Sequence, residues 1–225
     1  MCLVFFNVSC GLDVLSAVLE DPVTELETNP NEESSFDSRN FKFQIKTINA
    51  SNDLGYGYVY YKIYNRISTR TSEVNRIVDL ANDANKKTTS ASTMRDTYSY
   101  KELKLYGTDG KIVPLKFEND SQIIDIRLTS YSNIAEYSAY VKVNGTSIGI
   151  PLRSNDGTFN FAVAKADTVP QKGDDDTKNF ADPTGSNYYV ALFYVFMMYD
   201  DTYTPIYSPV HYLGTVMIDS SSDLN

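Results

Sequence analysis

The chain lacks tryptophan and has one histidine and two cysteines among its 225 residues. Both cysteines, Cys2 and Cys10, stand in the first ten residues. No disulfide can therefore staple the part of the chain that folds, so its stability must come from apolar burial. One histidine and no later cysteine nearly exclude a zinc site, which needs three or four suitable ligands. Glycine-rich phosphate-binding loops are also absent, and we expect no cofactor.

Basic residues are few, since 20 Lys and Arg face 29 Asp and Glu and the net charge is −9. Nucleic-acid-binding proteins present basic patches to phosphates, so we expect no nucleic-acid partner. The same acidity argues against adhesion of the folded part to anionic lipid. Long apolar runs are missing too. The longest, residues 188–199, falls short of the ~18 apolar residues of a membrane helix and is better interpreted as a central strand.

The N-terminus carries an apolar run over residues 2–8, followed by Ser9, Cys10 and Gly11. This pattern resembles the end of a bacterial lipoprotein signal peptide, which is cut before a cysteine that is then lipidated. Asn7 departs from the usual leucine, although spirochaete lipoproteins are looser at this position. The basic segment that opens a signal peptide is missing, so we expect the true start codon to lie upstream.

Residues 20–40 are rich in Pro, Asn, Ser and Glu and contain few large apolar side chains. Such a segment cannot bury enough surface to offset the entropy of ordering. We therefore expect a signal-peptide remnant at 1–10, a flexible acidic tether at 11–40 and a folded domain at 41–225. The alternative for the N-terminus is a short buried strand, or a helix through Leu12, Leu15, Val18 and Leu19.

From residue 41 onward, apolar and polar residues alternate with the period of half-buried strands. Asn144-Gly145 predicts a two-residue hairpin that pairs residue 143 with 146 and 141 with 148. Eight to ten short strands predict an all-β fold, an antiparallel β-sandwich, which we expect to be one large sandwich rather than two small ones. The expected strands are 41–45, 56–67, 103–105, 112–117, 124–128, 139–150, 159–163, 188–199 and 210–218. In the last of these, one face should carry Val210, Tyr212, Val216 and Ile218.

One helix is expected to interrupt the strands, inserted near residues 72–87. Ser72 can cap its start, Glu73 falls in the first turn, and Lys86 and Lys87 would lie at its negative end. Its apolar stripe, spaced i, i+3, i+4 and i+7, consists of Val74, Ile77, Val78 and Ala81.

The last third of the chain has a tyrosine-rich strand at 188–192 followed by a final strand at 210–218. This order resembles the last two strands of immunoglobulin-like and fibronectin-like modules. The wider segment 189–218, with Pro209-Val210-His211-Tyr212-Leu213-Gly214, is similar to lipoproteins of treponeme-type spirochaetes. The resemblance implies an immunoglobulin-like sandwich in the cell envelope, on the outer membrane or its periplasmic face, with no assigned function.

Catalytic candidates are weak. Gly145-Thr146-Ser147-Ile148-Gly149 matches G-x-S-x-G, and His211 follows it, with Asp200 or Asp201 between. A nucleophile elbow requires a strand, a turn and a helix, whereas this motif has strands on both sides. We therefore interpret the match as chance and His211 as a structural residue, and we expect no enzyme.

Two groups are candidate binding residues. Asp174, Asp175 and Asp176 share a loop with Asp182 and are weak calcium candidates, although the spacing matches no EF-hand and a solvated acidic loop is the simpler interpretation. Alternating tyrosines form an exposed-looking row that could stack on sugars, or serve only as strand surface. These tyrosines are Tyr58, Tyr60 and Tyr64.

Three functional hypotheses follow. The first is a non-catalytic envelope lipoprotein, anchored to a membrane through Cys10, with an adhesive, structural or partner-binding role toward an envelope or host protein or glycan. The alternative is a glycan-binding β-sandwich module that uses the tyrosine row. The third, a hydrolase, depends on Ser147 alone.

Overall fold

The computed structural model describes most of the chain from residue 21 onward and places two packed β-sheets and a short helical region. The described residues are 21–35, 38–45, 55–107, 110–114, 116–117, 121–129, 138–153, 161, 170, 173–178, 187–199 and 202–219. None of the described helices is long and apolar enough to cross a membrane.

The larger sheet contains seven strands in the order β1-β2-β8-β9-β10-β5-β6, and all its neighbours are antiparallel. In chain order its strands are β1 (Val23–Thr28), β2 (Phe41–Ile45), β5 (Lys104–Tyr106), β6 (Ile112–Pro114), β8 (Ile123–Arg127), β9 (Tyr140–Val143) and β10 (Thr146–Leu152).

The second sheet is built around two long strands, β3 (Gly55–Tyr64) and β12 (Asn187–Tyr199), which pair antiparallel along their length. Both β13 (Pro205–Tyr207) and β14 (His211–Asp219) pair with β12. Three short strands pair with β3: β4 (Lys101–Glu102), β7 (Lys116–Phe117) and β11 (Thr177–Lys178), of which only β11 is parallel.

Strands from the two halves of the chain pair with each other in both sheets. Pairs β2–β8, β5–β10 and β3–β12 each join a strand from before residue 118 to one from after residue 122. The halves therefore share both sheets. The predicted antiparallel β-sandwich is confirmed.

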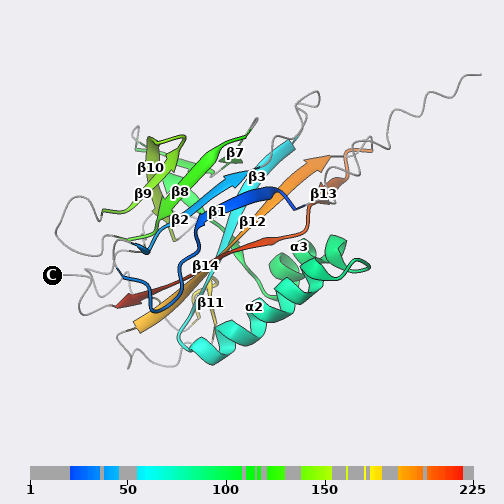
Figure 1. Cartoon of the computed structure of the whole chain (residues 1–225), viewed down its shortest axis with the longest axis horizontal. Helices are drawn as coiled ribbons and strands as arrows, with labels where there is room; N and C mark the ends of the chain where they lie inside the picture. Colours follow the sequence, from blue (N-terminus) through cyan, green and yellow to red (C-terminus); the bar gives the residue numbers. More distant parts are fainter. Residues whose placement is uncertain are drawn as a thin grey trace, which may run out of the picture.

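A helical layer covers the outer side of the second sheet. It consists of α2 (Ile67–Asn82), η2 (Lys87–Thr89), α3 (Ser90–Ser92) and η3 (Thr93–Thr97). Figure 1 shows α2 and α3 on the side of β12 away from the larger sheet. The second sheet is thus the middle layer of three, which explains why β12 is apolar on both faces.

Two hydrophobic cores flank the middle layer. The core between the sheets takes Phe41, Phe43, Val59 and Leu192, all fully buried. The second core lies under the helices and takes the opposite face of the same strands. Its buried members are Tyr58, Tyr64, Val74, Ile77, Ala91, Met94, Tyr100, Ala191, Phe193, Val195, Met197 and Val210.

The helix differs from the prediction at both ends, since α2 begins five residues before Ser72 and ends at Asn82. Its end has a local cause. Asp83 takes an extended ψ of 114°, and its carboxylate accepts a hydrogen bond from the Asn85 N–H at 2.9 Å. Short polar side chains that bond neighbouring backbone in this way compete with the helix. Lys86 and Lys87 consequently lie beyond it.

Part of the segment expected to be a tether is the strand β1. It pairs antiparallel with β2, and its Val23 belongs to the core between the sheets. The sequence of β1 has few apolar residues because β1 is an edge strand in which only Val23 is buried. Composition alone did not distinguish this edge strand from coil, so the prediction of flexibility is wrong over these residues.

A bulge interrupts the predicted hairpin register, and another interrupts the predicted alternation of the last strand. In the hairpin, Val143 pairs with Thr146 as predicted, but Val141 pairs with Gly149 instead of Ile148. A Cβ on Gly149 would lie 2.6 Å from the Tyr106 carbonyl oxygen, so glycine permits the close approach of β5. The Asn144-Gly145 turn itself is confirmed, with φ values of 49° and 80°.

The second bulge lies in β14. The pairing shifts between Leu192 and Phe193 of β12, so that Tyr212 and Gly214 pair with successive residues and Leu213 is the extra one. Gly214 has φ of 129°. Val210 and Tyr212 therefore face the helical core, whereas Leu213, Val216 and Ile218 face the core between the sheets. The prediction of a single face is wrong because a bulge shifts the alternation.

Candidate functional site

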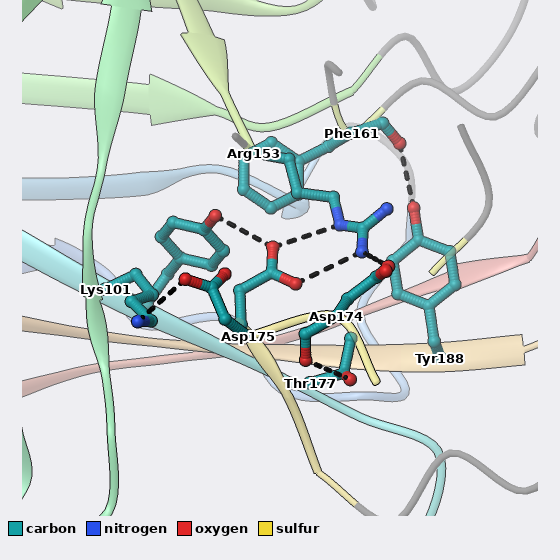
Figure 2. Close-up of polar contacts among 9 residues, drawn as sticks. Lys101, Arg153, Phe161, Asp174, Asp175, Thr177 and Tyr188 are labelled. Carbon is teal, nitrogen blue, oxygen red and sulfur yellow. Dashed lines mark hydrogen bonds and ion pairs between the residues drawn. The ribbon is translucent and has the colours of Figure 1, made fainter. Parts of the chain in front are cut away.

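The acidic loop is held by cations of the protein itself. Asp176, which is 4% exposed, accepts two hydrogen bonds of 3.1 Å from the Arg153 guanidinium. Arg153 also contacts Asp174, and the Lys101 ammonium lies 2.9 Å from the Asp175 carboxylate (Figure 2). Each calcium candidate thus faces a protein cation. Within the described residues, no group of three or more His, Cys, Asp or Glu is placed to hold a metal ion.

The clamp formed by Arg153 and Asp176 fastens the loop to the second sheet. The Tyr61 hydroxyl donates to the Asp176 carboxylate at 2.9 Å, and the Ile63 N–H donates to the Asp176 carbonyl at 3.0 Å. Burial, together with the negative charge of Asp176, raises the pKa of the Tyr61 phenol above its ordinary range. These contacts hold β11 beside β3, which indicates a structural role for the acidic residues.

The tyrosine row is not exposed in the way the alternation suggested. Tyr64 is fully buried beneath α2, with its hydroxyl 3.0 Å from a Glu73 carboxylate oxygen and 2.9 Å from the Tyr100 hydroxyl. Tyr58 is 9% exposed, and Tyr60 is half-buried. The prediction of an exposed row is therefore wrong for Tyr58 and Tyr64, and the helical layer covers the end of β3 that carries Tyr64.

Beside Tyr64 lies a buried ion pair. The Lys62 ammonium is 3.0 Å from the Glu73 carboxylate and also donates to the Tyr98 carbonyl. Lys178 lies 3.5 Å from the other Glu73 oxygen. Burial lowers the pKa of Lys62, although its bond to Glu73 opposes this shift. Since Glu73 comes from α2 and Lys62 from β3, this pair orients the helix on the sheet.

A tyrosine-rich surface at the other end of this sheet face was missed by the sequence reasoning. We call it the tyrosine surface and define it by Tyr56, Tyr58, Tyr60, Tyr199, Tyr207 and Arg95. The guanidinium carbon of Arg95 lies 4.3 Å from the centroid of the Tyr207 ring. Of these residues only Tyr58 and Tyr60 were candidates, and the alternation of tyrosines from residue 56 was the signal that could have extended the row backward.

Burial dominates the electrostatics of the tyrosine surface. It raises the pKa of Tyr58 to about 12, with further contributions from Glu102, Tyr199 and Tyr207. It also raises the pKa of Tyr60 to about 12, while the positive charge of Arg95 opposes the shift. The phenols of Tyr58 and Tyr60 are consequently neutral at physiological pH and keep their hydroxyl protons.

The residues of the hydrolase hypothesis do not form a triad in the described structure. Ser147 is exposed on β10, just after the hairpin turn of the larger sheet, and the strand continues to Leu152. His211 opens β14 in the second sheet, where its Nδ1 lies 2.6 Å from the Asp21 carboxylate. The other predicted partners, Asp200 and Asp201, lie outside the described residues, as does Cys10.

Comparisons with known proteins find no relative of this chain. No family model, no curated protein and no solved structure matches this chain.

Proposed function

We propose that this chain is a non-catalytic cell-envelope lipoprotein, anchored to a membrane through acylated Cys10, whose β-sandwich binds a partner. The observation that carries the proposal is the apolar run that ends in Ser9-Cys10-Gly11. The fold is compatible with this anchor, because the first described strand begins at Val23. Residues 11–22 could span at most about 40 Å between an anchored Cys10 and β1.

The described polar clusters favour a binding or structural role over catalysis. Two pairs of buried charged groups are matched with each other, Arg153 with Asp176 and Lys62 with Glu73. Both pairs join separate elements of the fold. A nucleophilic serine would need a base within hydrogen-bond reach, and Ser147 and His211 belong to different sheets.

The test is the fate of Cys10 in the native cell. The gene is expressed there with its upstream genomic sequence, as wild type and as the variants Cys10→Ala and Cys2→Ala. Membrane partition and intact mass are then measured. We expect a wild-type mass that begins at Cys10 and includes acyl chains, and we expect Cys10→Ala to lose membrane association.

The Cys2→Ala variant is the matched control, because it removes the other cysteine and leaves the proposed cleavage site in place. It should remain acylated and bound to the membrane. Unchanged membrane partition of Cys10→Ala, or a mature wild-type chain without lipid, would refute the anchor.

A further inference from the structure

The helical layer covers only part of the outer face of the second sheet. Helix α2 covers the end of that face that carries Tyr64, where Val74 and Ile77 are buried. The opposite ends of β3 and β12 run past the helices (Figure 1). At this far end β3 begins at Gly55 and β12 ends at Tyr199.

The far end carries mostly aromatic side chains, whereas the covered end carries both aliphatic and aromatic ones. Tyr56 pairs with Met197, and Met197 pairs with Tyr207, so that Tyr56 and Tyr207 flank Met197 in one cross-strand row. Tyr56, Tyr199 and Tyr207 pack against the helical core but are only half-buried. Each of these three tyrosines therefore keeps part of its side chain accessible at this end of the sheet.

Charged side chains adjoin the tyrosine surface. Arg95, from η3, stacks on Tyr207, and its side chain is 24% exposed. Glu102, from β4, contributes to the electrostatics of both Tyr58 and Tyr60. Aromatic walls with a small number of placed polar groups are the usual composition of small-ligand sites.

We propose that the tyrosine surface binds a neutral oligosaccharide. The C–H face of a pyranose ring is apolar and packs on an aromatic ring, while its hydroxyls exchange hydrogen bonds with phenol, guanidinium and carboxylate groups. This inference names a ligand class for the proposed partner-binding role and rests on that role, but it does not depend on acylation of Cys10.

The local charge favours a neutral sugar over an acidic one. The Arg95 guanidinium lies 3.6 Å from the Asp96 carboxylate, and Glu102 adds a second negative charge nearby. The positive charge of Arg95 is thus offset within the protein. An acidic saccharide would meet two carboxylates for one guanidinium, in a chain whose net charge is already −9.

The experiment uses the full chain with Cys10→Ala, so that lipid does not affect the result. Cellohexaose, chitohexaose and maltohexaose are titrated by calorimetry and by tyrosine fluorescence, with a hyaluronan hexasaccharide as the acidic comparison. Tyr207→Ala and Tyr199→Ala are the site variants. Tyr106→Ala is the matched control, since Tyr106 is 42% exposed and belongs to the other sheet.

We expect at least one neutral hexasaccharide to bind more tightly than the hyaluronan hexasaccharide, and each site variant to weaken that binding by about tenfold or more. Tyr106→Ala should leave the affinity unchanged. Circular dichroism checks that each variant is folded. If Tyr207→Ala fails to fold, Arg95→Met tests the same corner of the surface and should also weaken binding.

The proposal is overturned if none of the neutral hexasaccharides binds at millimolar concentration, if only the acidic one binds, or if binding survives the folded site variants. A negative result here leaves membrane anchoring through Cys10 standing. Conversely, sugar binding by an unlipidated native chain would leave the site standing without the anchor.

Discussion

The two faces of the second sheet bury the same two strands in different ways. Toward the larger sheet, β3 presents Val59, Tyr61 and Ile63, each at most 1% exposed. Toward the helices it presents Lys62 and Tyr64 with a buried ion pair and a hydrogen-bonded phenol. The first face is held mainly by apolar contacts, which are non-directional, and the Tyr61 hydroxyl adds one buried hydrogen bond to Asp176. The second combines apolar burial with polar contacts that also require a defined orientation of α2.

The apolar and polar contacts therefore contribute differently to the stability of the fold and to the position of α2. Desolvation of a buried ion pair offsets much of its attraction, so the pair between Lys62 and Glu73 is a weak source of net stability. Breaking it is costly, however, because one charge then stays buried without its partner. We infer that this ion pair fixes the position of α2, while the apolar side chains around it supply the driving force.

Alkaline pH should lower the free energy of unfolding through buried phenols on both faces of the second sheet, and we expect this change to be the largest. Burial raises the pKa of Tyr61 and Tyr194 on the inner face and of Tyr64 and Tyr100 on the helical side. Phenols of the unfolded chain ionise near pH 10, whereas these stay protonated in the folded protein, so the free energy of unfolding falls as pH rises above 10. By about pH 11 the loss is about 1.4 kcal/mol for each phenol.

Guanidinium chloride unfolding at pH 9 and pH 11 measures this loss. The four phenols together predict a decrease of about 5–6 kcal/mol. The lowered pKa of Lys62 acts in the opposite direction, because the unfolded chain keeps that proton to higher pH. Tyr194→Phe should reduce the pH dependence, and an equal dependence in that variant would contradict the assignment.

Glu73→Leu should selectively destabilise the helical side. Lys62 would remain buried without its carboxylate, and we expect the free energy of unfolding to fall by about 3–5 kcal/mol. The double variant Lys62→Met/Glu73→Leu should recover most of this loss. Chemical denaturation measures all three proteins. Glu27→Ala, which breaks the exposed pair with Lys42, is the control and should change little.

Gly214→Ala tests the bulge that turns β14 from one face of the sheet to the other. Its φ of 129° is unfavourable for alanine, and a Cβ there would lie 2.6 Å from the Pro30 carbonyl oxygen. Strain and overpacking together predict a loss of about 2–4 kcal/mol in thermal or chemical unfolding. A loss below about 1 kcal/mol would show that the bulge can move.

Gly145→Ala should have the smallest effect on the free energy of unfolding. Compared with Gly214→Ala, it separates backbone strain from the steric contact with Pro30. The φ of Gly145 is 80°, but nothing lies within 4 Å of an added Cβ. Only backbone strain applies, which predicts a loss of about 1 kcal/mol in chemical denaturation. A loss as large as that of Gly214→Ala would mean that the contact with Pro30 contributes nothing.

The fold class and most strands could be predicted from local pattern. The alternation at 41–45 and at Val59, Tyr61 and Ile63 placed these side chains correctly in one core, and the two-faced apolar run at 188–199 is the central strand β12. The strand β1 was not predicted because its composition is polar. It buries only Val23, which is 9% exposed, and it lies at the edge of the sheet with β2 as its neighbour. The position of α2 was shifted because no side chain caps its start.

Less of the candidate site than of the fold could be predicted from the sequence. The tyrosine row was recognised, but its burial depends on which part of β3 the helical layer covers. Arg95 carried no local signal, because it reaches Tyr207 from an element more than a hundred residues away in the chain. The cations that face the acidic loop, Lys101 and Arg153, were equally invisible in the spacing of Asp174 to Asp176.

The sequence by itself determined the all-β class, the Asn144-Gly145 turn and the absence of cysteines, and so of disulfides, from the folded part. Only the tertiary structure decided which face of β3 is covered, where β14 changes sides and which charges neutralise the acidic loop. The physical reason is that periodicity records how each segment alternates between burial and exposure. It carries no information about which distant segment covers a given face, and each sheet of this protein contains strand pairs that join opposite halves of the chain.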